Sequence, residues 1–151
     1  MEDALVVLED RDACADLLRE AAMYAKGADS ELVLYSPLTT EQYEETAETL
    51  DEIGRVENRE YGDDQALGVA FTFARELAND ALADMDVEWT IVADVVEERT
   101  ADHIVDIAEE HDCDHVFTLG NPRSPTGKAV FGDTTQRLIL NFPGYVTTRM
   151  S

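Results

Sequence analysis

Residues 4–27, ALVVLEDRDACADLLREAAMYAKG, are the stretch from which the fold of this chain can be predicted. Residues 4–8 form an apolar run with β-branched side chains, which is typical of a strand buried on both faces. A helix is expected from about Asp12, because alanines and leucines recur there at helical spacing, and Gly27 is expected to give its left-handed stop. A strand followed by a helix is the repeating unit of an α/β protein.

The rest of the chain continues this alternation. Further strands are expected at residues 31–35, 87–92, 116–119 and 145–148, and further helices at residues 65–82, from Thr100 onward and after the loop that follows Gly120. Ser36-Pro37 should end the second strand, because proline cannot continue a central ladder, and residues 39–60 should form a short helix or a mobile loop. The pattern predicts one Rossmann-like α/β domain over residues 1–151, with a five-stranded parallel sheet, right-handed crossovers and helices on both faces.

Acidic residues dominate the composition. The chain has 34 aspartates and glutamates against 11 lysines and arginines, a net charge of −23, and its only lysines are Lys26 and Lys128. We interpret this as a halophilic surface, because a Debye length of about 3 Å in molar salt screens the self-repulsion. A generic acidic protein is the alternative. A nucleic-acid partner is not expected, since the field repels a phosphate backbone.

The sequence gives no sign of a membrane segment or of a leader. It lacks a run of about 20 apolar residues, and its first residues lack the basic and apolar regions of a signal peptide. We therefore expect a cytoplasmic protein without membrane insertion. Cys14 and Cys113 are far apart in the sequence, and such thiols are more often buried than bridged in the cytoplasm.

Ligands of parallel sheets bind beyond the carboxyl ends of the strands. In this sequence those positions are Glu9-Asp10, Tyr35-Ser36, Asp94 and the loop after Leu119. The loop and the helix start after it read GNPRSPTGKAVFGDTTQ, residues 120–136. Glycines there let the backbone approach a ligand, and Arg123 and Lys128 gather positive charge, so an anion site is expected.

The start of the last helix supports a competing interpretation. Asp133 is followed three residues later by Gln136, as in a capping box, in which the carboxylate accepts hydrogen bonds from the free helix amides. A phosphate would meet that negative charge. An ordered loop that binds no phosphate is therefore the alternative.

The order of the elements over nearly the whole chain, together with this loop, resembles the universal stress protein family, in a haloarchaeal type of member. The resemblance implies a Rossmann-like fold of the adenine nucleotide alpha hydrolase type. ATP-binding members carry Gly, two residues, Gly, nine residues, Gly, and then Ser or Thr. Here Gly120 matches the first glycine, Arg123 stands at the second, and Gly132 matches the third with a spacing one residue shorter.

Two further positions follow from the same resemblance. Asp133 replaces the hydroxyl residue of the family motif, and Thr134 or Thr135 could supply that hydroxyl instead. The acid that contacts the nucleoside would be Glu9 or Asp10, although Arg11 stands near the place of the family's usual glycine.

A homodimer is expected through the last strand. Residues 142–148, from Phe142 to Thr148, would form an edge strand, and an exposed apolar edge is commonly covered by a partner chain. The family resemblance implies the same surface.

The sequence carries no signature of catalysis and no strong metal motif. No serine stands in a nucleophile elbow. His111-Asp112-Cys113-Asp114-His115 contains metal-binding residue types, but strand alternation would send Cys113 and His115 to one face and Asp114 to the other, so we expect no metal site.

The leading hypothesis is a non-catalytic regulatory protein of the stress response that binds ATP, with Mg²⁺, or another adenine nucleotide. The candidate binding residues are Glu9, Asp10, Ser36, Gly120, Arg123, Gly127, Lys128, Gly132, Asp133 and Thr134. Two alternatives stay open: a weak ATPase that uses the same loop, and a nucleotide-free interaction module, for example a partner of a transporter.

Overall fold

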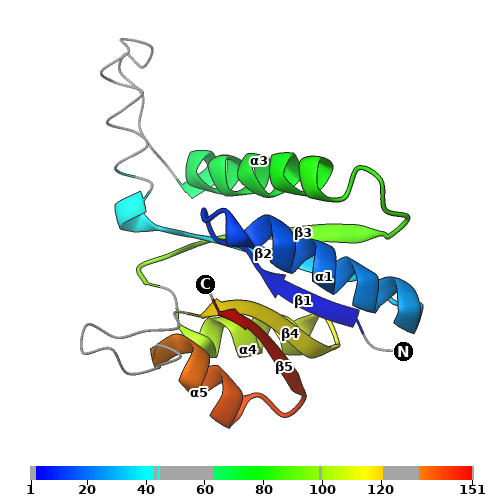
Figure 1. Ribbon diagram of the computed structural model, residues 1–151. Coiled ribbons are helices and arrows are strands. Elements are labelled where there is room, and N and C mark those ends of the chain that lie inside the picture. Colours follow the sequence, from blue (N-terminus) through cyan, green and yellow to red (C-terminus); the bar gives the residue numbers. More distant parts are fainter. Residues whose placement is uncertain (1–2, 43, 45–62, 99, 121–132, 151) are drawn as a thin grey trace.

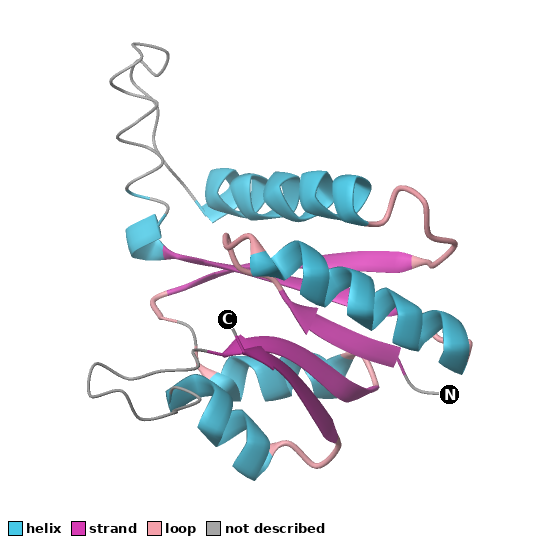
Figure 2. Ribbon diagram, viewed as in Figure 1, coloured by secondary structure: helices cyan, strands magenta, loops and turns pink. Residues whose placement is uncertain are grey.

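The computed structural model describes residues 3–42, 44, 63–98, 100–120 and 133–150 (Figure 1). Its elements are β1 (Asp3–Val7), α1 (Ala13–Ala28), β2 (Leu32–Thr39), α3 (Asp63–Ala81), β3 (Trp89–Val96), α4 (Ala101–Glu110), β4 (Cys113–Gly120), α5 (Asp133–Asn141) and β5 (Tyr145–Met150). The strands form a five-stranded parallel sheet in the order β3-β2-β1-β4-β5. Helices α1 and α3 cover one face and α4 and α5 the other (Figure 2). The predicted fold class is confirmed.

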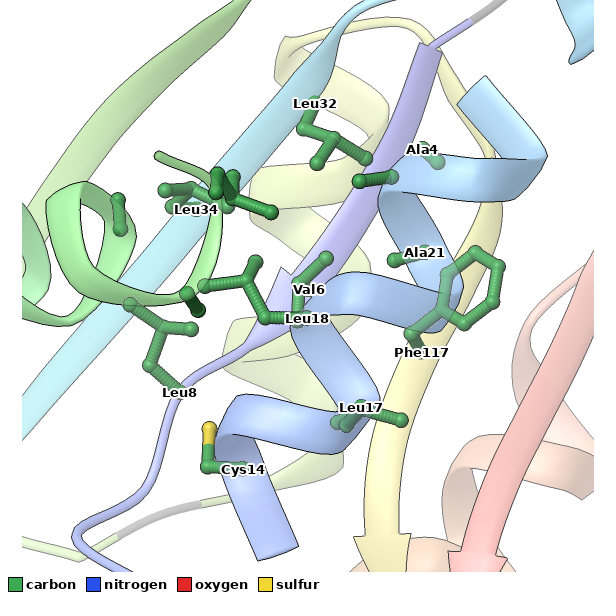
Figure 3. Close-up of a cluster of buried hydrophobic side chains, with 14 of the residues drawn as sticks. Ala4, Val6, Leu8, Cys14, Leu17, Leu18, Ala21, Leu32, Leu34 and Phe117 are labelled. Carbon is green, nitrogen blue, oxygen red and sulfur yellow. The ribbon is translucent and has the colours of Figure 1, made fainter. Parts of the chain in front are cut away.

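The central strand β1 is buried on both faces, as its apolar run predicts. Ala4 and Val6 enter the core beneath α1 and α3, whereas Leu5 and Val7 enter the core beneath α4 and α5. Figure 3 shows the first of these cores, where Cys14, Leu17, Leu18 and Ala21 of α1 lie beside Leu32, Leu34 and Phe117 of the sheet. Removing these side chains from water is the main favourable term for this layer.

Helix α1 continues past the glycine at which it was expected to stop. Gly27 lies inside the helix, and Asp29 takes the left-handed conformation instead, with φ 55° and ψ 46°. The N–H of Ser30 then donates to the Ala25 carbonyl at 2.9 Å and closes the helix end. Aspartate tolerates this conformation better than most residues other than glycine. The predicted stop at Gly27 was therefore wrong.

Strand β2 also continues further than expected, through Ser36-Pro37 to Thr39. Pro37 faces Asp94 of β3, while the register of β2 with β1 ends at Tyr35. Beyond that point β2 has a strand neighbour on one side only, and a proline is tolerated on such an edge. The break predicted at the proline was wrong because the pairing of β2 with β1 ends at Tyr35, whereas its pairing with β3 continues to Thr39.

A short helical turn follows β2 at residues 40–42. The Thr39 hydroxyl accepts from the Gln42 N–H at 3.1 Å, and the Gln42 side-chain oxygen accepts from the Thr39 N–H at 3.0 Å, as in a capping box. The helix or loop predicted over residues 39–60 otherwise lies almost entirely outside the described residues.

Helix α3 packs beside α1, and one arginine joins the two helices. Arg19 of α1 donates to the Ala81 carbonyl at 2.7 Å and lies 3.1 Å from the Asp84 carboxylate. The hydrogen bond with Asp84 raises the pKa of Arg19, and the same bond lowers the pKa of Asp84. Both ends of this ion pair are exposed, so concentrated salt weakens it.

Strand β4 begins with an irregular register beside β1. Two consecutive residues of β1 face Cys113 and His115, so Asp114 is an extra residue in β4. Cys113 therefore packs in the core beneath α4 and α5, whereas His115 turns to the other face and meets Tyr24 of α1. The expectation that Cys113 and His115 share one face was wrong because a bulge changes the alternation between them.

His115 is part of an aromatic cluster between α1, β4 and β5. Its ring stacks on Phe117 with centroids 4.4 Å apart and lies 4.5 Å from the ring of Tyr24. Its Nε2 is 2.7 Å from the hydroxyl of Thr147. Burial lowers the pKa of His115, while the charge of Asp114 opposes this shift.

Strand β5 lies at the edge of the described sheet and pairs there with β4. It begins at Tyr145, and Phe142 is instead buried in the core, with its N–H donating to the Leu138 carbonyl at 2.9 Å. The strand start predicted at Tyr145 is confirmed, whereas the expectation that the edge strand already includes Phe142 was wrong. A methyl group at Gly144 would overlap the Asp114 carbonyl, so glycine allows the chain to pass close to β4 on its way into β5.

Candidate functional site

A pocket of about 70 Å³ opens at the carboxyl ends of β1, β2 and β4. Its lining residues come from those strands, from the segment after β1 and from the starts of α4 and α5: Val7, Glu9, Tyr35, Pro37, Thr100, Ile104, Thr118, Leu119, Thr134 and Thr135. From β1 the chain adds β2 and β3 on one side of the sheet and then β4 and β5 on the other side. The strand order therefore reverses between β1 and β4, and the pocket lies there. Open parallel sheets bind ligands at this switch point.

Glu9 is the acid that the structure brings to the pocket. Its carboxylate lies 3.0 Å from the guanidinium of Arg11, and both side chains are partly exposed. The Glu9 N–H donates to Cys14 Sγ at 3.4 Å, and the Arg11 N–H donates to the Glu9 carbonyl at 2.9 Å, so the turn between β1 and α1 is held on both sides. Asp10, the other acid predicted here, is exposed and does not line the pocket.

Alternation along β2 decides which of its residues face the pocket. Tyr35 and Pro37 line it, and the Tyr35 hydroxyl donates to Asp94 Oδ2 at 3.2 Å. Ser36, the predicted site residue, is buried and donates to the Ala70 carbonyl of α3 at 2.8 Å. The structure therefore brings Tyr35 to the pocket and directs the Ser36 hydroxyl toward the opposite layer.

Two helix starts meet at the rim of the pocket. Thr100 caps α4, because its side chain accepts a hydrogen bond from the His103 N–H at 3.3 Å. Thr134 and Thr135 belong to the first turn of α5, and the buried Thr135 hydroxyl is 3.5 Å from the Leu119 carbonyl. The positive ends of two helix dipoles thus favour an anion at this rim.

Gly120, the last residue of β4, lies against the edge strand. A Cβ atom at this position would be 2.9 Å from Thr148 Cγ2 and 3.0 Å from Met150 Sδ. Close packing of β4 against β5 therefore requires a glycine here, in addition to any role toward a ligand.

Five predicted residues lie in or beside the loop after β4. Arg123, Gly127, Lys128 and Gly132 are outside the described residues, and Asp133 begins α5. The proposed capping by Asp133 also lies outside what the structure describes. Their part in binding stays a prediction.

The structure adds residues that the sequence reasoning did not select. Thr118, Thr100 and Ile104 line the pocket although none belongs to the predicted set. Thr118 lies two residues before the end of β4, and along β2 the pocket residues Tyr35 and Pro37 alternate with Ser36. The two-residue period of a strand was therefore the sequence signal from which pocket-lining residues could have been chosen.

Among the described residues, no group of three or more histidine, cysteine, aspartate or glutamate side chains could hold a metal ion. Cys14 and Cys113 are both buried and do not form a disulfide with each other. Across the same part of the chain, no helix combines the length and apolarity needed to span a membrane.

Comparison with known proteins identifies one family. The model of the universal stress protein family matches residues 1–147. A universal stress protein from Archaeoglobus fulgidus is 23% identical with a TM-score of 0.62, and the match covers 98% of this chain and 97% of that one. The structure of the Archaeoglobus fulgidus protein in complex with dAMP gives 20% identity, a TM-score of 0.56 and coverages of 98% and 96%.

A universal stress protein in complex with cAMP is 12% identical, with a TM-score of 0.62 and coverages of 99% and 96%. At these identities the solved structures support the fold. No protein with a curated function is significantly similar to the sequence.

Proposed function

Because the chain belongs to the universal stress protein family, we propose that it is a non-catalytic regulatory protein that binds an adenine nucleotide in the pocket at the ends of β1, β2 and β4. The observation that carries the proposal is the position of this pocket at the strand-order switch point, with Glu9 on its wall and two helix starts at its rim. The dAMP and cAMP complexes of two similar proteins support it.

The described residues suggest how a nucleotide would lie. The Glu9 carboxylate is an acceptor suited to ribose hydroxyls, while Tyr35 and Ile104 offer apolar surface to a base. Phosphates would extend toward the starts of α4 and α5, where the helix dipoles and Thr134 favour negative charge. From the sequence we further propose that Arg123 and Lys128 would add positive charge, that Gly120, Gly127 and Gly132 would allow close backbone approach, and that Mg²⁺ would accompany ATP.

Calorimetric titration of ATP and AMP, with Mg²⁺, in about 2 M KCl tests this proposal under conditions that screen the surface charge. We expect saturable heat, weaker ATP binding in Lys128→Ala, and unchanged binding in the matched variant Lys26→Ala, which alters the last turn of α1. Absence of heat with every adenine nucleotide would retire the proposal in favour of a nucleotide-free interaction module. Phosphate release from ATP would show an ATPase instead.

We also propose a homodimer formed through β5. The strand ends the described sheet, and Tyr145 of β5 and Met23 of α1 are 68% and 62% exposed. A groove of about 480 Å³ between α1 and β5 adds concave surface beside this edge. Sedimentation in about 2 M KCl should give a dimer that Tyr145→Asp dissociates, whereas Phe71→Asp on the exposed side of α3 should leave it intact. A monomeric wild type would contradict this.

The charge supports a proposal about the environment. With a net charge of −23, a surface adapted to concentrated cytoplasmic salt would lose compactness in dilute buffer. We expect the free energy of unfolding to rise as KCl increases from about 0.2 to about 2 M, since the Debye length falls from about 7 Å to about 2 Å. A stability that is independent of salt would contradict the proposal.

A further inference from the structure

His115 lies where the edge strand β5 begins, and three elements enclose its ring. In the register of the sheet it is paired with Tyr145, the first residue of β5. The ring stacks on Phe117 at 4.4 Å and lies 4.5 Å from the ring of Tyr24 on α1. Its Nε2 is 2.7 Å from the hydroxyl of Thr147 on β5. One titratable side chain thus joins α1 and β4 to the first half of β5.

The other ring nitrogen of His115, Nδ1, is buried and has no hydrogen-bond partner among the described residues. A neutral histidine carries a proton on one ring nitrogen only, whereas an imidazolium carries an N–H on both. Protonation therefore places an N–H group at Nδ1, where none of the described residues accepts it, and a buried donor without an acceptor is costly. The aromatic cluster accommodates the neutral ring and disfavours the charged one.

The groups around His115 only partly offset this cost. Asp114, which precedes it in β4, and the face of the Phe117 ring both attract a cation. Burial nevertheless lowers the pKa of His115 more than the Asp114 charge raises it. Tyr24 and Tyr145 present phenol groups from α1 and β5. The other charged groups on the enclosing elements and on the neighbouring β1 are bonded elsewhere, line the groove beside Thr147 or lie in the last turn of α1: Asp3, Asp16, Arg19, Glu20, Lys26 and Arg149.

β5 is the element that should open when the ring leaves the cluster. None of its six residues is buried, whereas α1 contributes seven buried residues to the core. β5 also lies at the edge of the described sheet and pairs there with β4 (Figure 1). Segments with few buried contacts open at the lowest free energy. Release of the ring therefore separates the first half of β5 from β4 before α1 moves.

We propose that His115 makes the β5 edge a pH-sensitive switch, in which protonation as the pH falls below about 6.5 releases residues 145–147 from β4 while the rest of the sheet stays folded. The released histidine binds a proton with its ordinary pKa and the enclosed one binds it less readily, so acid favours the open edge. At about pH 5 the released histidine is protonated about 30 to 1, which limits the increase in opening to about 30-fold. The proposed homodimer uses the same edge, so acid would also weaken association there.

Hydrogen exchange followed by mass spectrometry measures this opening directly. The full chain is exchanged at about pH 7.5 and about pH 5 in about 2 M KCl, and the protection of residues 143–150 is divided by that of residues 4–8 in the central strand. We expect this ratio to fall about tenfold in the wild type and less than about twofold in His115→Gln, whose side chain does not titrate. His111→Gln is the matched control, because His111 lies at the end of α4 and should leave the response unchanged.

Asp114→Asn is a second variant, and its expected effect does not follow from a merely structural role of the histidine. It removes the charge that favours the imidazolium within the folded cluster, so the fall in the ratio at about pH 5 should exceed that of the wild type. Circular dichroism at both pH values establishes that each variant is folded, and either variant alone decides the outcome.

Several results would overturn the switch. These are a wild-type ratio that does not change with pH, an equal fall in His115→Gln, and a smaller fall in Asp114→Asn. A response that disappears on about tenfold dilution would also overturn it, because association of chains would then protect the edge. A chain that sediments as a monomer and still shows the response would refute the proposed homodimer and leave the switch standing.

Discussion

Replacing Gly120 by alanine should destabilise the protein even when no ligand is present. The new Cβ would be 2.9 Å from Thr148 Cγ2, a separation that real Cβ contacts essentially never show, so one strand must shift. Thr148 is β-branched and cannot turn away freely, whereas the sulfur of Met150 at 3.0 Å lies on a flexible side chain. Thr148 is therefore the contact that decides the cost.

The magnitude follows from two opposing terms. Overpacking costs about 1–3 kcal/mol, and replacing glycine within a strand returns about 0.5–1 kcal/mol of backbone entropy. With both terms at the middle of their ranges, the net loss of unfolding free energy should be about 1 kcal/mol, with extremes of about 0 and about 2.5 kcal/mol. In a chain of this size a loss of about 1 kcal/mol lowers the melting temperature by about 2–4 °C.

Urea unfolding at constant KCl measures this change, and a second substitution tests its cause. Thr148→Ser removes Cγ2, so the double variant should recover most of the loss, with a coupling energy of about 1–2 kcal/mol. Gly68→Ala is the matched control, because a Cβ there meets nothing within 4 Å and an alanine within α3 should stabilise by about 0.5–1 kcal/mol. Wild-type stability in Gly120→Ala, or no recovery in the double variant, would show that the glycine is not required by packing against β5.

Three further predictions concern the described core and its charged groups. Because burial lowers the pKa of His115, the unfolded chain binds a proton at a higher pH than the folded chain does, and the folded state loses stability as the pH falls below about 6.5. Urea unfolding at two pH values should show that His115→Gln loses less unfolding free energy on acidification than the wild type. The pKa of Glu31 is raised, mainly by its hydrogen bond with Glu88, so this pair stabilises the fold at acid pH and the stabilisation is lost as the pH rises through the raised pKa. At pH 7 Glu88→Gln should therefore have a higher melting temperature than the wild type. An equal or lower melting temperature would contradict this. Leu138→Ala in the core should cost about 2–5 kcal/mol of unfolding free energy by urea titration, whereas Leu140→Ala, 75% exposed on the same helix, should change it by less than about 0.5 kcal/mol.

Most of the fold could be predicted from the sequence, because strands buried on both faces leave continuous apolar runs. Residues 4–8 and 116–119 are such runs, and both strands are present. The errors arose where tertiary neighbours decide the outcome. Pro37 stays in β2 because β1 has ended beside it, and the bulge at Asp114 depends on the register with β1. In both cases the strand that decides the outcome, β1, is distant in the sequence from the residue concerned.

The candidate site was predictable in position and less so in its residues. A parallel sheet places ligands beyond its carboxyl strand ends, which pointed to Glu9 and the segment after Tyr35. Choosing Ser36 missed the strand period, since its hydroxyl bonds to α3 while Tyr35 and Pro37 line the pocket. The orientation of Tyr35 by Asp94 joins positions 59 residues apart, and no local pattern encodes it.

The strand order also has a consequence for synthesis in the cell. One neighbour of β1 follows soon, but the other, β4, begins only at Cys113, about 110 residues after Asp3. At about 5–20 residues per second, one edge of the first strand stays open for roughly 5–20 s while the ribosome continues. An apolar strand with an open edge is a template for aggregation, and like charges on neighbouring nascent chains oppose their contact. The dense acidic surface would then protect the chain before it folds, at the stage when its most apolar strand lacks its second partner.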